Sequence, residues 1–134
     1  DSLKAGTVVV IDWQVNVSGV AANDNMVNKL YIGGSAAGTA LQTTTGTDPE
    51  AGDMLCGHYE LTCRTTGASG TFVGFGFLTL VPGASGVPAV TPNFTASTTI
   101  NTTASQAIVI TTDWDGTTSA ANTSRLDILT VKVY

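Results

Sequence analysis

The feature that most constrains the fold is an alternation of apolar and polar side chains over Thr7–Val17. From Val9 onward every odd-numbered position of this segment is apolar, whereas Asp12, Gln14 and Asn16 occupy even-numbered positions. Successive side chains of a strand point to opposite faces, so this pattern predicts a strand with one buried face. No window has the apolar spacing of an amphipathic helix over three turns, and β-branched residues predominate. We therefore expect an all-β chain with no substantial helix.

Turn signals divide the rest of the chain into further strands. A turn-rich run over Ser18–Asn28 ends the first strand, and Gly33 with Gly34 ends a short second strand. Apolar runs and alternation predict the later strands, at Leu30–Ile32, Leu55–Arg64, Thr71–Val81, Phe94–Thr102, Ala107–Trp114 and Leu126–Tyr134. About eight strands without crossover helices, in a chain of 134 residues, predict a single antiparallel two-sheet sandwich domain over residues 1–134.

The last predicted strand changes parity partway along its length. Leu126 and Ile128 share one parity, whereas Leu129, Val131 and Val133 share the other. An extra residue in one strand of an antiparallel pair disrupts the ladder locally and restores it one position later. We therefore expect a β-bulge near Ile128, which would reconcile the two sets.

The segment Thr71–Val81 carries bulky apolar residues on both of its faces. Phe72 lies on one parity, and Phe75 and Phe77 lie on the other. A two-layer sandwich normally buries only the inner face of each sheet, so the outer aromatic set needs another cover. The Pro-rich stretch Val81–Pro92 or a second subunit could supply that cover.

We expect a second subunit to cover this strand, and we predict Phe72, Phe75 and Phe77 as subunit-interface residues. Gly74 and Gly76 have no side chains on their face, which would allow a neighbour's backbone to come close. Charged residues make up 11% of the chain, against about 25% in typical soluble domains. The usual electrostatic barrier to association is therefore low.

The charge balance excludes two classes of partner. Ten acidic residues against five basic ones give a formal net charge of -5 at pH 7. Five scattered basic residues form no patch that could neutralise phosphates, so we expect no nucleic-acid partner. An anionic membrane surface would repel the chain, and no apolar run approaches the ~18 residues of a transmembrane helix. We therefore expect no membrane partner.

The single histidine, His58, raises the question of a metal site because it shares a parity with Cys56 and Glu60. At ~3.3 Å per residue, Cys56 and Glu60 lie some 13 Å apart along a strand, whereas zinc ligands lie within ~2.0–2.3 Å of the ion. We therefore expect an ordinary polar face, with no metal and no other cofactor. Cys56 and Cys63 have opposite parities on the same strand and are too far apart for a disulfide, so both are predicted to be free thiols.

Groups that could carry catalysis are scarce. The chain has no Gly-x-Ser-x-Gly motif, and His58 is the only histidine that could activate a nucleophile. Asp113 and Asp115 could act as the paired carboxylates of a hydrolase, but any two residues at i and i+2 on a strand end have a suitable separation. A turn at Asp115–Gly116 explains them more simply. We predict no catalytic residues and no enzymatic activity.

In residue usage and segment order, the last two thirds of the chain are similar to one group of proteins. Phe94–Trp114 reads FTASTTINTTASQAIVITTDW, a Thr-rich strand followed by an apolar strand that ends in Trp. A loop containing Ala, Ser and Asn follows, and then a last strand rich in Leu and Val up to Tyr134. This part resembles the closing hairpin of jelly-roll modules in tailed-phage virions. Gly57–Thr62 and Gly70–Phe72 fit the middle strands of such modules.

The resemblance implies an antiparallel jelly-roll sandwich that assembles as a homotrimer and acts by protein packing, without catalysis. The implied role is a capsid decoration or cement protein, a head fibre or a tail-fibre module of a tailed bacteriophage. The expected location is the virion, and the expected partners are the major capsid protein or other virion proteins. The alternative is a carbohydrate-binding module or receptor-binding tip, for which Trp114 and Tyr59 are the candidate ligand contacts.

Overall fold

The computed structural model describes residues 3–18, 25–33, 40–43, 48–83, 87–115 and 121–134. Within these ranges the chain forms strands and no helix, so none of the described residues belongs to a helix that could cross a membrane. The strands are β1 (Val8–Ser18), β2 (Asn25–Ile32), β3 (Ala40–Thr43), β4 (Asp53–Cys63), β5 (Gly70–Val81), β6 (Ala89–Ile100), β7 (Ile108–Asp115) and β8 (Thr123–Val133). The all-β prediction is confirmed.

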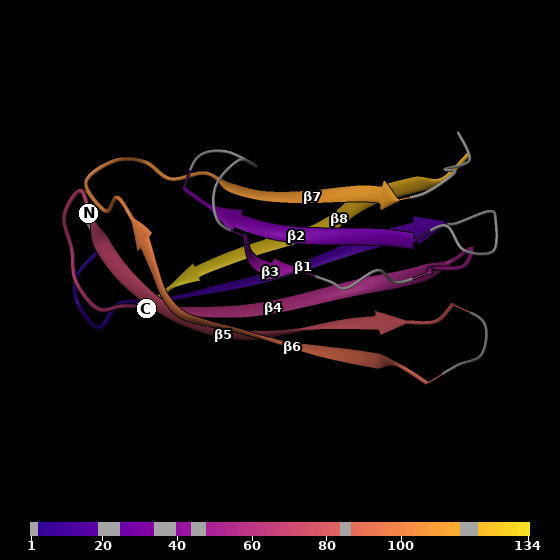
Figure 1. Cartoon of the computed structure of the whole chain (residues 1–134), viewed down its shortest axis with the longest axis horizontal. Helices are drawn as coiled ribbons and strands as arrows, with labels where there is room; N and C mark the ends of the chain where they lie inside the picture. Colours follow the sequence, from indigo (N-terminus) through magenta and orange to yellow (C-terminus); the bar gives the residue numbers. More distant parts are fainter. Residues whose placement is uncertain (1–2, 19–24, 34–39, 44–47, 84–86, 116–120) are drawn as a thin grey trace.

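The strands form two antiparallel sheets that face each other (Figure 1). One sheet has five strands in the order β6-β5-β4-β1-β8, and the other has three strands in the order β3-β2-β7. The predicted two-sheet sandwich is therefore confirmed. The strand order does not establish a jelly roll, because β4, β5 and β6 are consecutive neighbours in a meander. The hairpin expected over Phe94–Trp114 is wrong, because β6 and β7 belong to different sheets.

The alternation in β1 and β4 positions the core as predicted. The odd-numbered side chains of both strands point inward and are buried, whereas the intervening side chains are exposed or half-buried. The bulge in the last strand is also confirmed. Gln14 pairs with Ile128 but Val15 pairs with Leu126, which leaves Asp127 as the extra residue. The bulge keeps both Leu126 and Leu129 on the inner face, opposite inward residues of β1.

Two features of the smaller sheet differ from the sequence prediction. β2 begins at Asn25, within the run expected to be a turn, and β3 lies in a Thr-rich segment where no strand was predicted. In β2 a polar residue, Asn28, interrupts the inward apolar set, which hides the alternation. The structure buries Asn28, and its Nδ2 donates a hydrogen bond to Thr112 Oγ1 of β7 at 2.9 Å.

A buried glutamine on β3 ties the smaller sheet to the larger one. Gln42 Oε1 accepts a hydrogen bond from Trp13 Nε1 at 3.2 Å, and Gln42 Nε2 donates to the carbonyl oxygens of His58 and Phe77, each at 3.0 Å. The Trp13 ring lies over Gly57, where an added Cβ would come within 2.1 Å of the indole. These contacts hold β3 against the centre of the five-stranded sheet.

Candidate self-association surfaces

The outer face of the five-stranded sheet divides into an apolar and a polar half. Across β4, β5 and β6 the register places Glu60 opposite Phe75 and Phe75 opposite Phe94. The next row places His58 opposite Phe77 and Phe77 opposite Pro92. Since directly opposed residues share a face, the bulky apolar residues gather over β5 and β6. We call the set Phe75, Phe77, Val90 and Phe94 the β6-edge patch.

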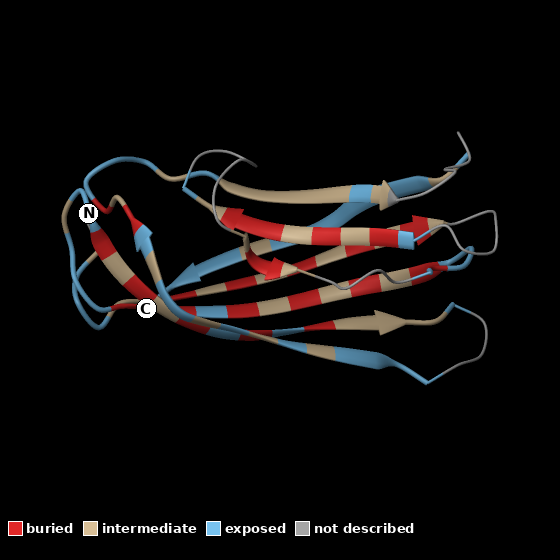
Figure 2. Cartoon of the chain, in the orientation of Figure 1, coloured by how far each residue is buried: buried red, intermediate tan, exposed pale blue. Residues whose placement is uncertain are grey.

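The β6-edge patch is open to solvent in the single chain. Phe75, Phe77 and Phe94 are 54%, 41% and 73% exposed, and Figure 2 shows much of β6 as exposed. Phe75 and Phe77 therefore stay exposed beside the described residues of the stretch Val81–Pro92, 81–83 and 87–92, whereas residues 84–86 lie outside the described residues. A second subunit remains the predicted cover.

Phe72 does not belong to this patch, and its prediction as an interface residue is corrected. Its side chain is 1% exposed, because its parity turns it into the core between the two sheets. The role expected for Gly74 and Gly76 is also corrected. An added Cβ at these glycines would lie 2.6 and 2.5 Å from Tyr59 ring atoms, so they make room for Tyr59 of the same chain.

The polar half of the face centres on His58. Its Nδ1 lies 2.6 Å from Asp12 Oδ1, its Nε2 lies 3.4 Å from Glu60 Oε1, and its ring stacks on Phe77 at 5.2 Å between centroids. Cross-strand pairing brings Asp12 to His58, which sequence spacing alone does not indicate. Among the residues that the structure describes, no three potential metal ligands form a group suited to an ion.

The two thiols lie on opposite faces of β4, as predicted. Cys63 is buried and donates a hydrogen bond to the carbonyl oxygen of Thr65, whereas Cys56 is half-buried on the outer face, and both are free. Burial raises the pKa of the Cys56 thiol. Because the thiolate is the nucleophilic form, Cys56 is a weak nucleophile although it lines a groove of about 380 Å³ beside His58.

The other aromatic candidates face inward. Tyr59 is fully buried, and its hydroxyl shares a hydrogen bond with Thr95 Oγ1, so the prediction of Tyr59 as a ligand contact is wrong. Trp114 is partly buried and packs against the core from β7. Asp113 on the same strand is exposed, and the side chain of Asp115 lies outside the described residues. Among the described residues, the exposed aromatic side chains are therefore those of the β6-edge patch and Tyr134.

A second apolar surface lies along β8, at the other edge of the five-stranded sheet. We call its residues the β8-edge patch: Leu126, Leu129, Val131 and Val133 on the inner face of the sheet, and Ile128 on the outer face. They are 42–59% exposed, and Figure 2 shows β8 as exposed along most of its length. Sequence reasoning did not find this patch, because apolar and polar residues alternate along β8 in the same way as in a strand with a buried face.

The β8-edge patch is uncovered because the smaller sheet does not extend over it. Among the described strands β8 packs extensively only against β1. Leu129 lies opposite Trp13 on the same inner face, yet Trp13 is 2% exposed and Leu129 is 43% exposed. β8 lies one strand further from the centre of the sandwich than β1, and at this distance β2 and β7 no longer cover its inner face.

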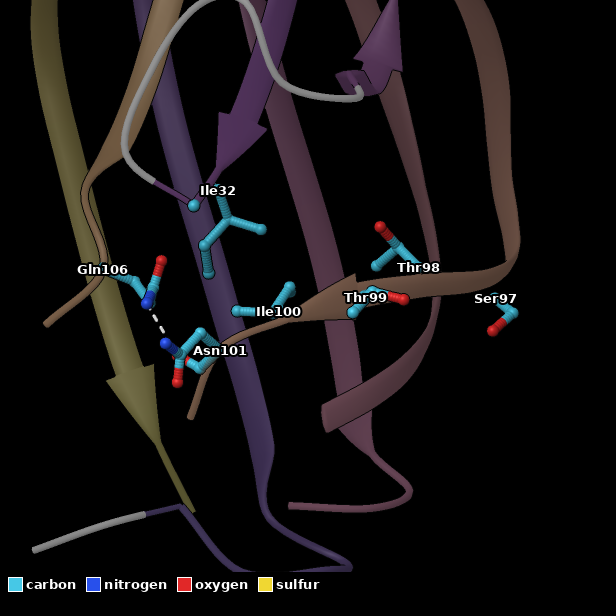
Figure 3. A pocket seen from close by; sticks show the side chains of 8 residues that line it. Ile32, Ser97, Thr98, Thr99, Ile100, Asn101 and Gln106 are labelled. Carbon is cyan, nitrogen blue, oxygen red and sulfur yellow. Dashed lines mark hydrogen bonds between the residues drawn. The ribbon is translucent and has the colours of Figure 1, made fainter. Parts of the chain in front are cut away.

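A separate hollow lies at the end of the sandwich, where β2 and β6 end (Figure 3). It has a volume of about 440 Å³ and is lined by hydroxyl, amide and aliphatic groups. Gln106 Nε2 donates a hydrogen bond to the Asn101 carbonyl oxygen at 2.6 Å, which closes the loop beside it. No charged side chain is among its described lining residues, so this hollow has no group for acid-base chemistry.

Comparisons of the chain with models of protein families, with curated proteins and with solved structures found no match.

Proposed function

We propose that this chain is a non-catalytic structural subunit of a tailed-phage virion, which assembles with copies of itself through its apolar sheet edges. The observation that carries the proposal is the pair of exposed apolar patches, on β5 with β6 and on β8. Contiguous apolar surface of this kind marks sites of protein association. Fully burying a Phe or Leu side chain contributes roughly 1.5–3 kcal/mol, so covering either patch would stabilise an assembly substantially.

The composition supports the same role. Only 11% of the residues are charged, whereas the chain contains 23 Thr and 15 Gly. A surface with few charges can be brought against another copy without the desolvation of many ions. The resemblance of the residue usage in the last two thirds of the chain to tailed-phage modules adds the proposed setting, although β6 and β7 do not form the closing hairpin of such modules. The proposed assembly is a homotrimer that decorates a capsid or forms part of a fibre, with the major capsid protein or other virion proteins as further partners.

The chemistry of the outer face supports a role without catalysis. His58 is the one histidine in the chain, and both of its ring nitrogens lie near carboxylates. The neighbouring thiol, Cys56, has a pKa raised by burial and therefore stays protonated at neutral pH. A nucleophile and base acting together need an ionised or activatable thiol. The polar cluster is better explained as the solvated part of a packing surface.

One observation favours carbohydrate binding as a second candidate function. Phe75 and Phe94 lie side by side in a shallow groove of about 190 Å³, with Glu60 and Thr62 among its other lining residues. Aromatic rings can stack on the apolar face of a sugar, while a carboxylate and a hydroxyl can bond to its hydroxyl groups. This candidate uses Phe75 and Phe94 in place of Tyr59 and Trp114.

Sedimentation velocity of the whole chain at tens of micromolar tests the proposed function. We expect an oligomer, and we expect Phe75→Ser/Phe77→Ser to yield smaller species at the same concentration. Val87→Ser is the matched control, since Val87 is 88% exposed and lies outside both patches. A wild-type chain that is monomeric throughout this range would overturn the proposal. Binding of that monomer to immobilised oligosaccharides, lost in Phe94→Ser, would then establish the second candidate.

A further inference from the structure

We propose that copies of this chain associate head to tail, with the β6-edge patch of one copy packed against the β8-edge patch of the next. This inference rests on the proposed self-assembly and specifies its geometry. Each patch is therefore covered by a second copy of the chain, which contacts it through the patch at its opposite sheet edge.

The strand order places the two patches at opposite edges of the larger sheet. In the order β6-β5-β4-β1-β8 the patches lie at opposite edges, with β4 and β1 between them. At about 4.7–4.9 Å per strand spacing, β6 and β8 are separated by four spacings, or roughly 19 Å. The patches also lie on different faces, since Phe75 and Phe94 point outward and four of the five β8 residues point inward. The outer face between the two edges carries Asp12, His58 and Glu60, which suits a surface that remains in water.

Symmetry favours contact between unlike patches. A two-fold contact uses the same patch of both copies, so it would cover one apolar surface and leave the other exposed. A head-to-tail contact covers one patch of each kind, and repetition covers both patches of every copy. Such contacts close into a ring when the rotation between neighbours allows it. A closed ring of three would be the expected trimer.

The exposed aromatic area of the β6-edge patch is a substantial part of the area that a stable contact buries. At about 150–250 Å² per aromatic side chain, the exposed fractions of Phe75, Phe77 and Phe94 leave roughly 250–420 Å² of ring surface open. A standard interface buries about 800 Å² per partner. The three rings therefore supply about a third to a half of one side, and the surrounding polar rim supplies the rest.

Charges at the rims of the two patches are complementary. Glu60 lies beside Phe75 at the border of the β6-edge patch. Lys132 lies on β8, on the same outer face as Ile128, whereas Arg125 is already paired with Asp127 at 2.5 Å. Since the other four residues of the β8-edge patch face inward, it is a contact that reaches the outer side of β8 that can bring Glu60 toward Lys132 of the next copy. A contact between two β6-edge patches would bring the two Glu60 carboxylates together, which is unfavourable.

Mixing two assembly-deficient variants tests the inference. Phe75→Ser/Phe94→Ser removes the β6-edge patch, and Leu129→Ser/Val131→Ser removes the β8-edge patch. We expect each variant alone to sediment as a monomer, and an equimolar mixture to form a one-to-one heterodimer through the intact patch of each. Head-to-tail association is overturned if either variant alone still dimerises, or if the mixture stays monomeric while the wild type assembles. A monomeric wild type would instead overturn the proposed function itself.

Charge reversal provides a second test that leaves the apolar packing intact. Both Glu60→Lys and Lys132→Glu should weaken wild-type assembly, each by roughly twofold to fivefold in the dissociation constant. The double variant should recover most of this loss, because it restores opposite charges across the contact. Absence of an effect from Lys132→Glu, with unchanged circular dichroism and assembly, would contradict the proposed contact even if the Leu129→Ser/Val131→Ser variant failed to fold.

Discussion

β1 and β8 are neighbours in one sheet and share one pattern, yet they end in opposite environments. Both strands alternate apolar residues on the inner face, and Trp13 of β1 lies directly opposite Leu129 of β8. Trp13 is buried under the smaller sheet and bonded to Gln42, whereas nearly half of Leu129 is open to water. Alternation therefore shows which face of a strand favours burial. Whether the same chain buries that face depends on how far the opposite sheet extends.

The same contrast occurs within β5. Phe72 and Phe75 are three residues apart, but Phe72 faces the smaller sheet and Phe75 faces outward. Their shared chemistry led to the prediction of a single interface, and the structure separates them into a core residue and a surface residue. The surface set is therefore defined by the side of the sheet on which each ring lies, together with Phe94 contributed by β6.

The sharpest test of the comparison between β1 and β8 replaces Trp13 and Leu129 with Ala, one at a time. We expect Trp13→Ala to lower the free energy of unfolding by about 3–5 kcal/mol, since it empties a filled core site and leaves Gln42 without its indole donor. Leu129→Ala should cost roughly 1–2 kcal/mol, because half of the side chain is already in water. Urea denaturation at low concentration, where assembly does not contribute, measures both values. Equal losses would show that the two strands do not differ as described.

The bridging glutamine tests what holds the smaller sheet in place. Gln42→Ala should destabilise the chain by about 1–3 kcal/mol, because it leaves the buried Trp13 N–H without an acceptor and removes the two hydrogen bonds from Gln42 Nε2 to carbonyl oxygens of the larger sheet. Gln14→Ala is the matched control, since the Gln14 amide is half-buried and bonds only to a weak acceptor, Met54 Sδ. Thermal melts of the two variants give the comparison. A melting temperature of Gln42→Ala no lower than that of Gln14→Ala would contradict this role.

Alkaline pH gives the smallest expected effect and probes the buried side of β4. Burial raises the pKa of Tyr59, and the hydrogen bond to Thr95 opposes this only in part. The folded state therefore holds the phenolic proton more tightly than the unfolded state, so stability should fall as the pH rises above about 10. Tyr59→Phe cannot ionise and should show a shallower decline between pH 9 and 11.5 in urea titrations. An identical slope in both proteins would contradict the assignment.

Much of the larger sheet was predictable from local pattern. The strands β1 and β4, their inward and outward sets and the bulge at Asp127 follow from parity, which depends only on neighbouring residues. The smaller sheet was less predictable, because polar side chains occupy its inward positions. Asn28 and Gln42 become acceptable in a core because Thr112 and Trp13, far away in the sequence, each form a hydrogen bond with one of these amides. The same dependence on distant partners hid β3 and the start of β2.

The sequence by itself determined that this chain is all-β, which faces of its best-patterned strands favour burial, and that its surface carries few charges. These properties follow from side-chain period and composition, which need no knowledge of the partner strands. Only the tertiary structure decided that Phe72 lies inside, that Phe75 joins Phe94, and that β8 extends beyond its cover. The physical reason is that the burial of a side chain depends on how two sheets of unequal width pack together. Packing between distant segments produces no pattern in the local sequence of either segment.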